Sequence, residues 1–303
     1  MSTLQIFNKE TKKEIKKDWR IELARLISIV IIIIYHILIF TNWVDINNWY
    51  QTWPIVVAIG CFMYCSGNVH GLKKEFNEPG SLSISNYLNF VKKRFIRLYF
   101  GYYLGLFMVF IIKYICGKLP VITPFSLFLD LTSLWPLITG NSGGIWPEGW
   151  FICDIFILSL IYPLLRRLKK QYLSIIIIVV PIFQIMIMFS PFYKFAYFFP
   201  FFWTTEFIIG MLFGDNRSKH IGIPVVNGQI KKIIVKMGNR VWPLYLAHMA
   251  LISILPLFAP WWMCVSLIPF ILLLTEGYYH LLNKIYNLTG YGYSTLKAQK
   301  RPN

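Results

Sequence analysis

The chain has 303 residues, of which 56% are hydrophobic and only 14% are charged, and its formal net charge is +17. A soluble protein needs many more polar side chains to cover its surface, so this composition excludes one. The positive charge lies in short stretches between long apolar runs. That distribution argues against a nucleic-acid partner and favours contact with the anionic lipids of a membrane.

The apolar runs predict membrane-spanning helices, because each run is long enough to cross a hydrocarbon core of about 30 Å. In chain order they lie near residues 21–41, 52–70, 95–116, 149–166, 172–190, 196–214, 240–258 and 261–281. Prolines and glycines interrupt the segment 117–148, which is either an external loop with a short interfacial or re-entrant helix, or a further pair of spans. We expect an all-α integral membrane protein, a polytopic helical bundle of 8–10 transmembrane helices.

Clusters of lysine and arginine predict the orientation of the bundle. They precede the first span, separate the second from the third, and follow the fourth, the sixth and the last. With eight spans all of these clusters lie on one side, which places both termini in the cytoplasm of a multi-pass protein of the cell membrane. We expect a basic cytoplasmic segment over 1–20, a transmembrane domain over 21–285 and a cytoplasmic tail over 286–303.

Two ionisable residues, Arg25 and His36, lie in the first predicted span. Ionisable side chains are energetically unfavourable within a bilayer, so those that occur there usually have a function. Eleven residues of α-helix bring both side chains to the same face, about 16 Å apart along the axis. Arg25 could hold an anionic substrate near the cytoplasmic end, and His36 could move a proton deeper in the membrane. The alternative is an arginine that reaches the interface beside a histidine that bonds a neighbouring helix.

Five stretches together resemble the acyltransferase-3 family of membrane O-acyltransferases. They are the pair Arg25 and His36, TyrCysSerGlyAsn at 64–68, Arg94 and Arg97 in an Arg-x-x-Arg pattern, TrpProGluGlyTrpPhe at 146–151, and GlyAsnArgValTrpProLeuTyrLeuAlaHis at 238–248. The chain departs from the family where Ile152 replaces a leucine and where Val-Trp replaces Ser-Tyr in the last stretch. The resemblance extends from about Asp18 to His280.

The resemblance implies transfer of an acyl group, usually acetyl, from cytoplasmic acyl-CoA to a hydroxyl of a surface polysaccharide or a lipid-linked sugar. His36 would act as general base, or alternatively would carry the acyl group covalently. Lys93, Arg94 and Arg97 would bind the phosphates of coenzyme A, since guanidinium forks suit phosphate oxygens. Their alternative role is an ordinary basic flank of the third span.

Other residues could orient His36 or bind the acceptor. Glu206 lies within an apolar run and either orients His36 or bonds another helix. The predicted acceptor-binding residues are Asp45, Trp146, Glu148, Trp150, Tyr245 and His248. The tryptophans could stack on a sugar or anchor the bilayer interface. Gly101 and Gly105 suggest close helix packing, and we expect His70 at the periphery.

Two other functions are compatible with the sequence. A transporter or flippase of the same family would move a glycan or acyl group without its own chemistry, and a scaffold or receptor would need none of the ionisable residues within spans. Dependence on coenzyme A distinguishes the enzyme from both. No cysteine or histidine spacing is typical of a metal site, so we expect no metal.

Overall fold

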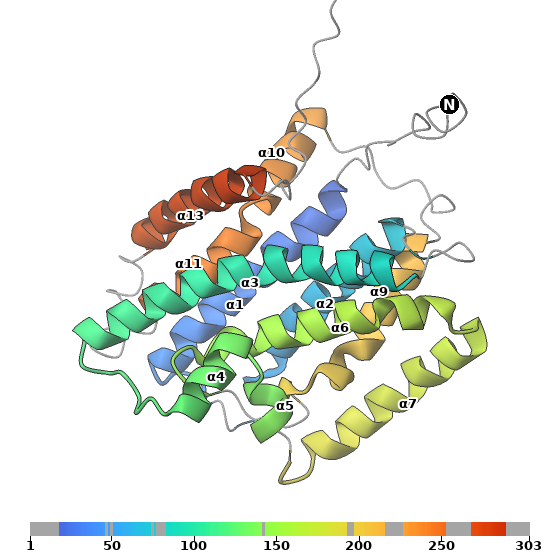
Figure 1. Ribbon diagram of the computed structural model, residues 1–303, viewed down its shortest axis with the longest axis horizontal. Coiled ribbons are helices and arrows are strands. Elements are labelled where there is room, and N and C mark those ends of the chain that lie inside the picture. Colours follow the sequence, from blue (N-terminus) through green and yellow to red (C-terminus); the bar gives the residue numbers. More distant parts are fainter. Residues whose placement is uncertain are drawn as a thin grey trace, which may run out of the picture.

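The computed structural model of the protein (Figure 1) describes residues 18–45, 48, 51–73, 76, 83–140, 143–192, 197–215, 227–252 and 268–288. The elements in that part are α1 (Trp19–Phe40), α2 (Trp53–Lys73), α3 (Ile84–Ile115), α4 (Pro124–Thr132), α5 (Trp135–Thr139), η2 (Pro147–Gly149), α6 (Trp150–Arg167), α7 (Lys170–Met188), η3 (Pro200–Trp203), α9 (Thr204–Asp215), α10 (Gly228–Gly238), α11 (Val241–Ile252) and α13 (Ile268–Leu288). Every regular element over these residues is a helix, which confirms the all-α prediction.

Five of the described helices are long and apolar enough to cross a membrane. They cover Trp19–Ile39, Trp53–Leu72, Ile84–Ile115, Pro147–Arg167 and Lys170–Met188. These helices confirm a polytopic membrane bundle, in which α7 and α13 lie at opposite edges (Figure 1). The total of eight to ten spans stays a prediction, because residues 253–267 between α11 and α13 lie outside the described part, as do most of the two predicted terminal segments.

The sixth predicted span, 196–214, is wrong as a single helix. The chain instead makes the 3-10 turn η3 and then α9, which has 12 residues and is therefore only about 18 Å long. Pro200 begins η3 and lacks a backbone N–H, so it starts a helical turn readily but interrupts a continuous helix. Hydropathy alone does not reveal such a break.

Helix α3 begins earlier than the predicted span 95–116. The side chain of Ser83 caps its N-terminus by accepting a hydrogen bond from Asn86 N at 3.1 Å. The helix then runs for 32 residues, about 48 Å, which exceeds the hydrocarbon thickness. Arg94 and Arg97 consequently lie within the helix rather than at its start.

The segment between α3 and α6 contains no further pair of spans in its described part, because α4 and α5 have only nine and five residues. Asp130 of α4 stabilises the fold of this segment, because its carboxylate accepts hydrogen bonds from Ile145 N at 3.1 Å and from Trp135 Nε1 at 3.0 Å. Burial raises the pKa of Asp130, and these two donors oppose that shift. Tyr102 of α3 donates to the Asp130 carbonyl, which ties the segment to the bundle.

Glycines bring α2 and α9 together in the most extensive helix contact of the fold. A Cβ atom at Gly67 would lie 2.8 Å from the carbonyl carbon of Phe207 and closer still to its oxygen. Gly71 meets the Met211 carbonyl in the same way, and Gly210 on α9 meets the carbonyl of Tyr64. Small residues at these positions allow the two backbones to touch, as is common between membrane helices.

An ion pair joins the ends of α6 and α9. Arg166 Nη2 lies 2.5 Å from Asp215 Oδ1, so the C-terminal ends of both helices lie at one face of the bundle. The N-terminal ends of α1, α3 and α7 lie toward the same side in Figure 1. This agrees with the grouping of the basic clusters, which predicts that this side faces the cytoplasm.

Candidate functional site

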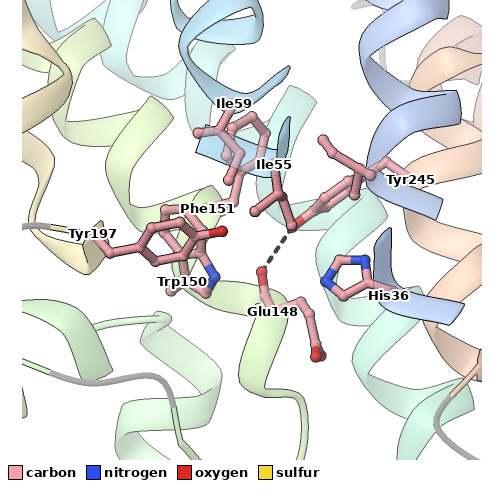
Figure 2. A pocket seen from close by; sticks show the side chains of 9 residues that line it. His36, Ile55, Ile59, Glu148, Trp150, Phe151, Tyr197 and Tyr245 are labelled. Carbon is pink, nitrogen blue, oxygen red and sulfur yellow. Dashed lines mark hydrogen bonds between the residues drawn. The ribbon is translucent and has the colours of Figure 1, made fainter. Parts of the chain in front are cut away.

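A small cavity lies among α1, α2, α6 and α11, with a volume of about 30 Å³, room for one or two water molecules. Figure 2 shows its lining, which consists of Ile32, His36, Ile55, Ile59, Glu148, Trp150, Phe151, Tyr197 and Tyr245. Three lining residues were candidates from the sequence as polar or aromatic groups for substrate, namely Glu148, Trp150 and Tyr245. The cavity places them beside the predicted catalytic residue, His36.

A second histidine lies against His36. The rings of His36 on α1 and His248 on α11 have centroids 5.5 Å apart and planes inclined by 39°. His248 is fully buried, and its Nδ1 lies 3.2 Å from the Leu244 carbonyl. Over the described residues, neither Nδ1 of His36 nor Nε2 of His248 has a hydrogen-bond partner. Both of these nitrogens are buried within the bundle.

Tyr245 links α11 to the turn that opens α6. Its hydroxyl donates a 2.7 Å hydrogen bond to the Glu148 carbonyl, drawn as the dashed line in Figure 2. Its ring lies 5.2 Å from Phe151 and 5.6 Å from His248, measured between centroids. Because Glu148 lies in the short turn η2, this bond fixes the backbone that carries Glu148 and Trp150 into the cavity.

Trp146 and Asp45 are not brought into the cavity with the other predicted acceptor-binding residues. Trp146 is 1% exposed, stacks on Tyr102 at 5.3 Å and fills the space beside Gly105. Asp45 is exposed beyond the end of α1, and its backbone N–H donates to Gln51 at 2.8 Å. The packing of Trp146 leaves no face of its ring open to a sugar.

The two remaining predicted catalytic residues lie away from the cavity lining. Arg25 is partly exposed, 3.6 Å from the Glu22 carboxylate, one turn earlier on α1. Glu206 packs beside Gly60, where an added Cβ would lie 3.4 Å from its Cγ, and its Oε2 has no hydrogen-bond partner in the described part of the chain. The geometry brings neither residue into contact with His36.

Two of the predicted coenzyme A residues, Lys93 and Arg94, differ in their surroundings. Lys93 is exposed, whereas Arg94 turns inward and its guanidinium contacts the ring of His70. The carbonyl of Arg97 accepts a 2.7 Å hydrogen bond from Tyr286 on α13. The peripheral position expected for His70 is wrong, since this residue is fully buried and its ring lies 4.5 Å from that of Tyr162.

Asp154 is a buried carboxyl group to which the prediction assigned no function. It is 0% exposed, and neither of its oxygens has a hydrogen-bond partner among the described residues. It follows Trp150 and Phe151 by one helical turn and therefore lies on the face of α6 that borders the cavity. Its signal in the sequence is an acidic residue one turn inside an apolar run.

One known family matches the chain. Residues 18–222, more than half of the chain, match the model of the acyltransferase-3 family, which is described as an acyltransferase domain. The match includes His36, Arg94 and Trp150, and it ends before Tyr245 and His248. A search of curated proteins and a search of solved structures found no match for the chain. The chain belongs to the acyltransferase-3 family and is a membrane acyltransferase.

Proposed function

We propose that the protein is an O-acyltransferase that moves an acyl group, in the first instance acetyl, from cytoplasmic acyl-CoA to a hydroxyl of a glycan or glycolipid. The observation that carries this proposal is the cavity at His36, whose imidazole lines the same small space as Glu148, Trp150 and Tyr245. The cavity has room for one or two water molecules, so in this proposal it admits the hydroxyl group of the acceptor rather than a whole sugar ring.

His36 acts as the general base in this proposal. The acceptor oxygen attacks the thioester carbonyl while the imidazole of His36 takes the hydroxyl proton, a new C–O bond forms and the C–S bond breaks. The leaving thiolate of coenzyme A receives that proton from the imidazole, so protons balance and free thiol is released. The neighbouring ring of His248 restrains His36 by packing at 5.5 Å between centroids.

The donor binds along the cytoplasmic half of α3 in this proposal. Lys93 is exposed there, and Arg94 and Arg97 lie one turn apart on the same helix. Guanidinium groups form paired hydrogen bonds with phosphate oxygens, and the exposed ammonium adds a point charge. The contact between Arg94 and His70 holds this guanidinium toward the interior, where the thioester end of the donor would enter the bundle.

The test uses the full-length protein purified in detergent, radiolabelled acetyl-CoA and a membrane glycolipid extract. Release of free thiol together with label in the glycolipid is the expected result. Label that stays on the protein when acceptor is omitted would indicate a covalent acyl-imidazole in place of general-base catalysis. A protein that neither binds acetyl-CoA nor releases thiol would refute acyl-CoA dependence and leave transport of a glycan or acyl group as the alternative.

A further inference from the structure

The proposed transfer reaction uses no residue of helix α10. This helix lies in a part of the sequence where no span is predicted, and it packs against the start of α1. Gly238 meets Glu22 closely enough that a Cβ would collide with that side chain, and Lys231 Nζ lies 5.9 Å from the centre of the Trp19 ring. These contacts place α10 beside the end of the first span that is predicted to face the cytoplasm.

The side chains of α10 divide into three sectors at 100° per residue. Lys231, Ile234, Val235 and Gly238 fall in one sector and are partly or fully buried, so this sector faces the bundle. Ile230, Ile233 and Met237 fall in a second sector. All three side chains are exposed, at 49%, 57% and 46%.

The third sector is basic and also exposed. It contains Gln229, Lys232 and Lys236, and it lies roughly 100° around the helix from the apolar sector. A helix with one face for hydrocarbon and an adjacent face of lysine has the side-chain distribution of a helix that lies in a membrane surface. In water, three neighbouring exposed apolar side chains would be unfavourable, but in the headgroup region the same residues reach the acyl chains.

We propose that α10 lies in the plane of the cytoplasmic leaflet, with Ile230, Ile233 and Met237 in the acyl-chain boundary and with Lys232 and Lys236 bound to anionic phospholipid headgroups. Charge complementarity selects this occupant, since each lysine near a negatively charged leaflet is attracted to it within a Debye length. A short connection through Asn239 joins α10 to α11, which lies within the bundle. There, Arg240 pairs with Glu276 of α13, with Nη2 3.1 Å from Oε2.

Photo-crosslinking in nanodiscs tests the orientation of α10. A benzophenone amino acid replaces Ile233 in one full-length variant and Gln229 in a matched control, and each protein is irradiated among radiolabelled phospholipids. Residue 233 should form phospholipid adducts several-fold more efficiently than residue 229. Equal labelling at the two positions, or none at residue 233, would overturn the proposed orientation.

The headgroup assignment has its own test, the rise in melting temperature when phosphatidylcholine nanodiscs are replaced by discs containing phosphatidylglycerol. The Lys232→Gln/Lys236→Gln double variant should lose most of this rise, whereas Lys169→Gln/Lys170→Gln, an exposed pair at the start of α7, should keep it. Because all four side chains are exposed or at a helix end, the variants should fold. An unchanged response in the α10 variant, or an equal loss in both, would overturn the assignment of anionic lipid to α10.

Discussion

The close packing of α2 on α9 makes a quantitative prediction for Gly67→Ala. The added Cβ would lie 2.8 Å from the carbonyl carbon of Phe207, whereas non-bonded carbon atoms pack best at about 3.5–4.0 Å, so the helices must move apart. Overpacking against backbone, which cannot rotate away, should cost about 3 kcal/mol. Alanine gains about 1 kcal/mol over glycine in helix propensity, so the net loss of stability should be about 2 kcal/mol.

Gly277→Ala on α13 is the matched control, because no atom of the described neighbouring residues lies within 4 Å of the Cβ that alanine would add. The control should gain about 1 kcal/mol from helix propensity, so the two variants should differ by about 3 kcal/mol in opposite directions. The assay is thermal unfolding in detergent, followed by the reaction of a thiol-specific dye with the buried Cys65 and Cys153. Equal melting temperatures for the two alanine variants would refute the proposed backbone contact.

Three further variants test the cavity and the buried polar groups. Tyr245→Phe should lower acyl transfer, since the bond to the turn at Glu148 is lost. Tyr99→Phe removes a comparable hydroxyl–backbone bond from a residue that does not line the cavity, so it should leave kcat unchanged. Equal kcat losses in the two variants would contradict this. Asp154→Leu should keep or raise the melting temperature, because it removes a buried carboxyl without described partners, and a clear decrease would mean that this carboxyl is bonded. His70→Ala should lower the free energy of unfolding by about 2–4 kcal/mol, because it leaves a cavity in an aromatic cluster. Thermal unfolding measures this loss, and a wild-type melting temperature would contradict the prediction.

Much of the fold could be predicted from the sequence, because membrane spans are long apolar runs that do not depend on distant contacts. Helices α1, α2, α6 and α7 lie close to the predicted ranges for this reason. The early start of α3 and the break before α9 were missed. The first depends on the cap at Ser83 and the second on Pro200, and both are local signals that average hydropathy conceals.

The site was predictable only in part, because its geometry depends on which helices are neighbours. Residue type and depth made His36 a candidate, and the TrpProGluGlyTrpPhe stretch made Glu148 and Trp150 candidates; all three line the cavity. The contact between His36 and His248 joins helices that are far apart in the sequence, so no local pattern could predict it. Trp146 was assigned to substrate because tryptophan is common both at sugar sites and at interfaces, yet its ring packs inside the bundle on Tyr102.

The central claim is that His36 performs the chemistry while Arg94 holds the donor, and a kinetic comparison of two alanine variants tests it most directly. In the acetyl-CoA transfer assay, His36→Ala should lose kcat by at least about 10²-fold, the usual contribution of a general base, with little change in KM for acetyl-CoA. Arg94→Ala should instead raise that KM, with a smaller effect on kcat. A His36→Ala protein that transfers acetyl at the wild-type rate would contradict the account.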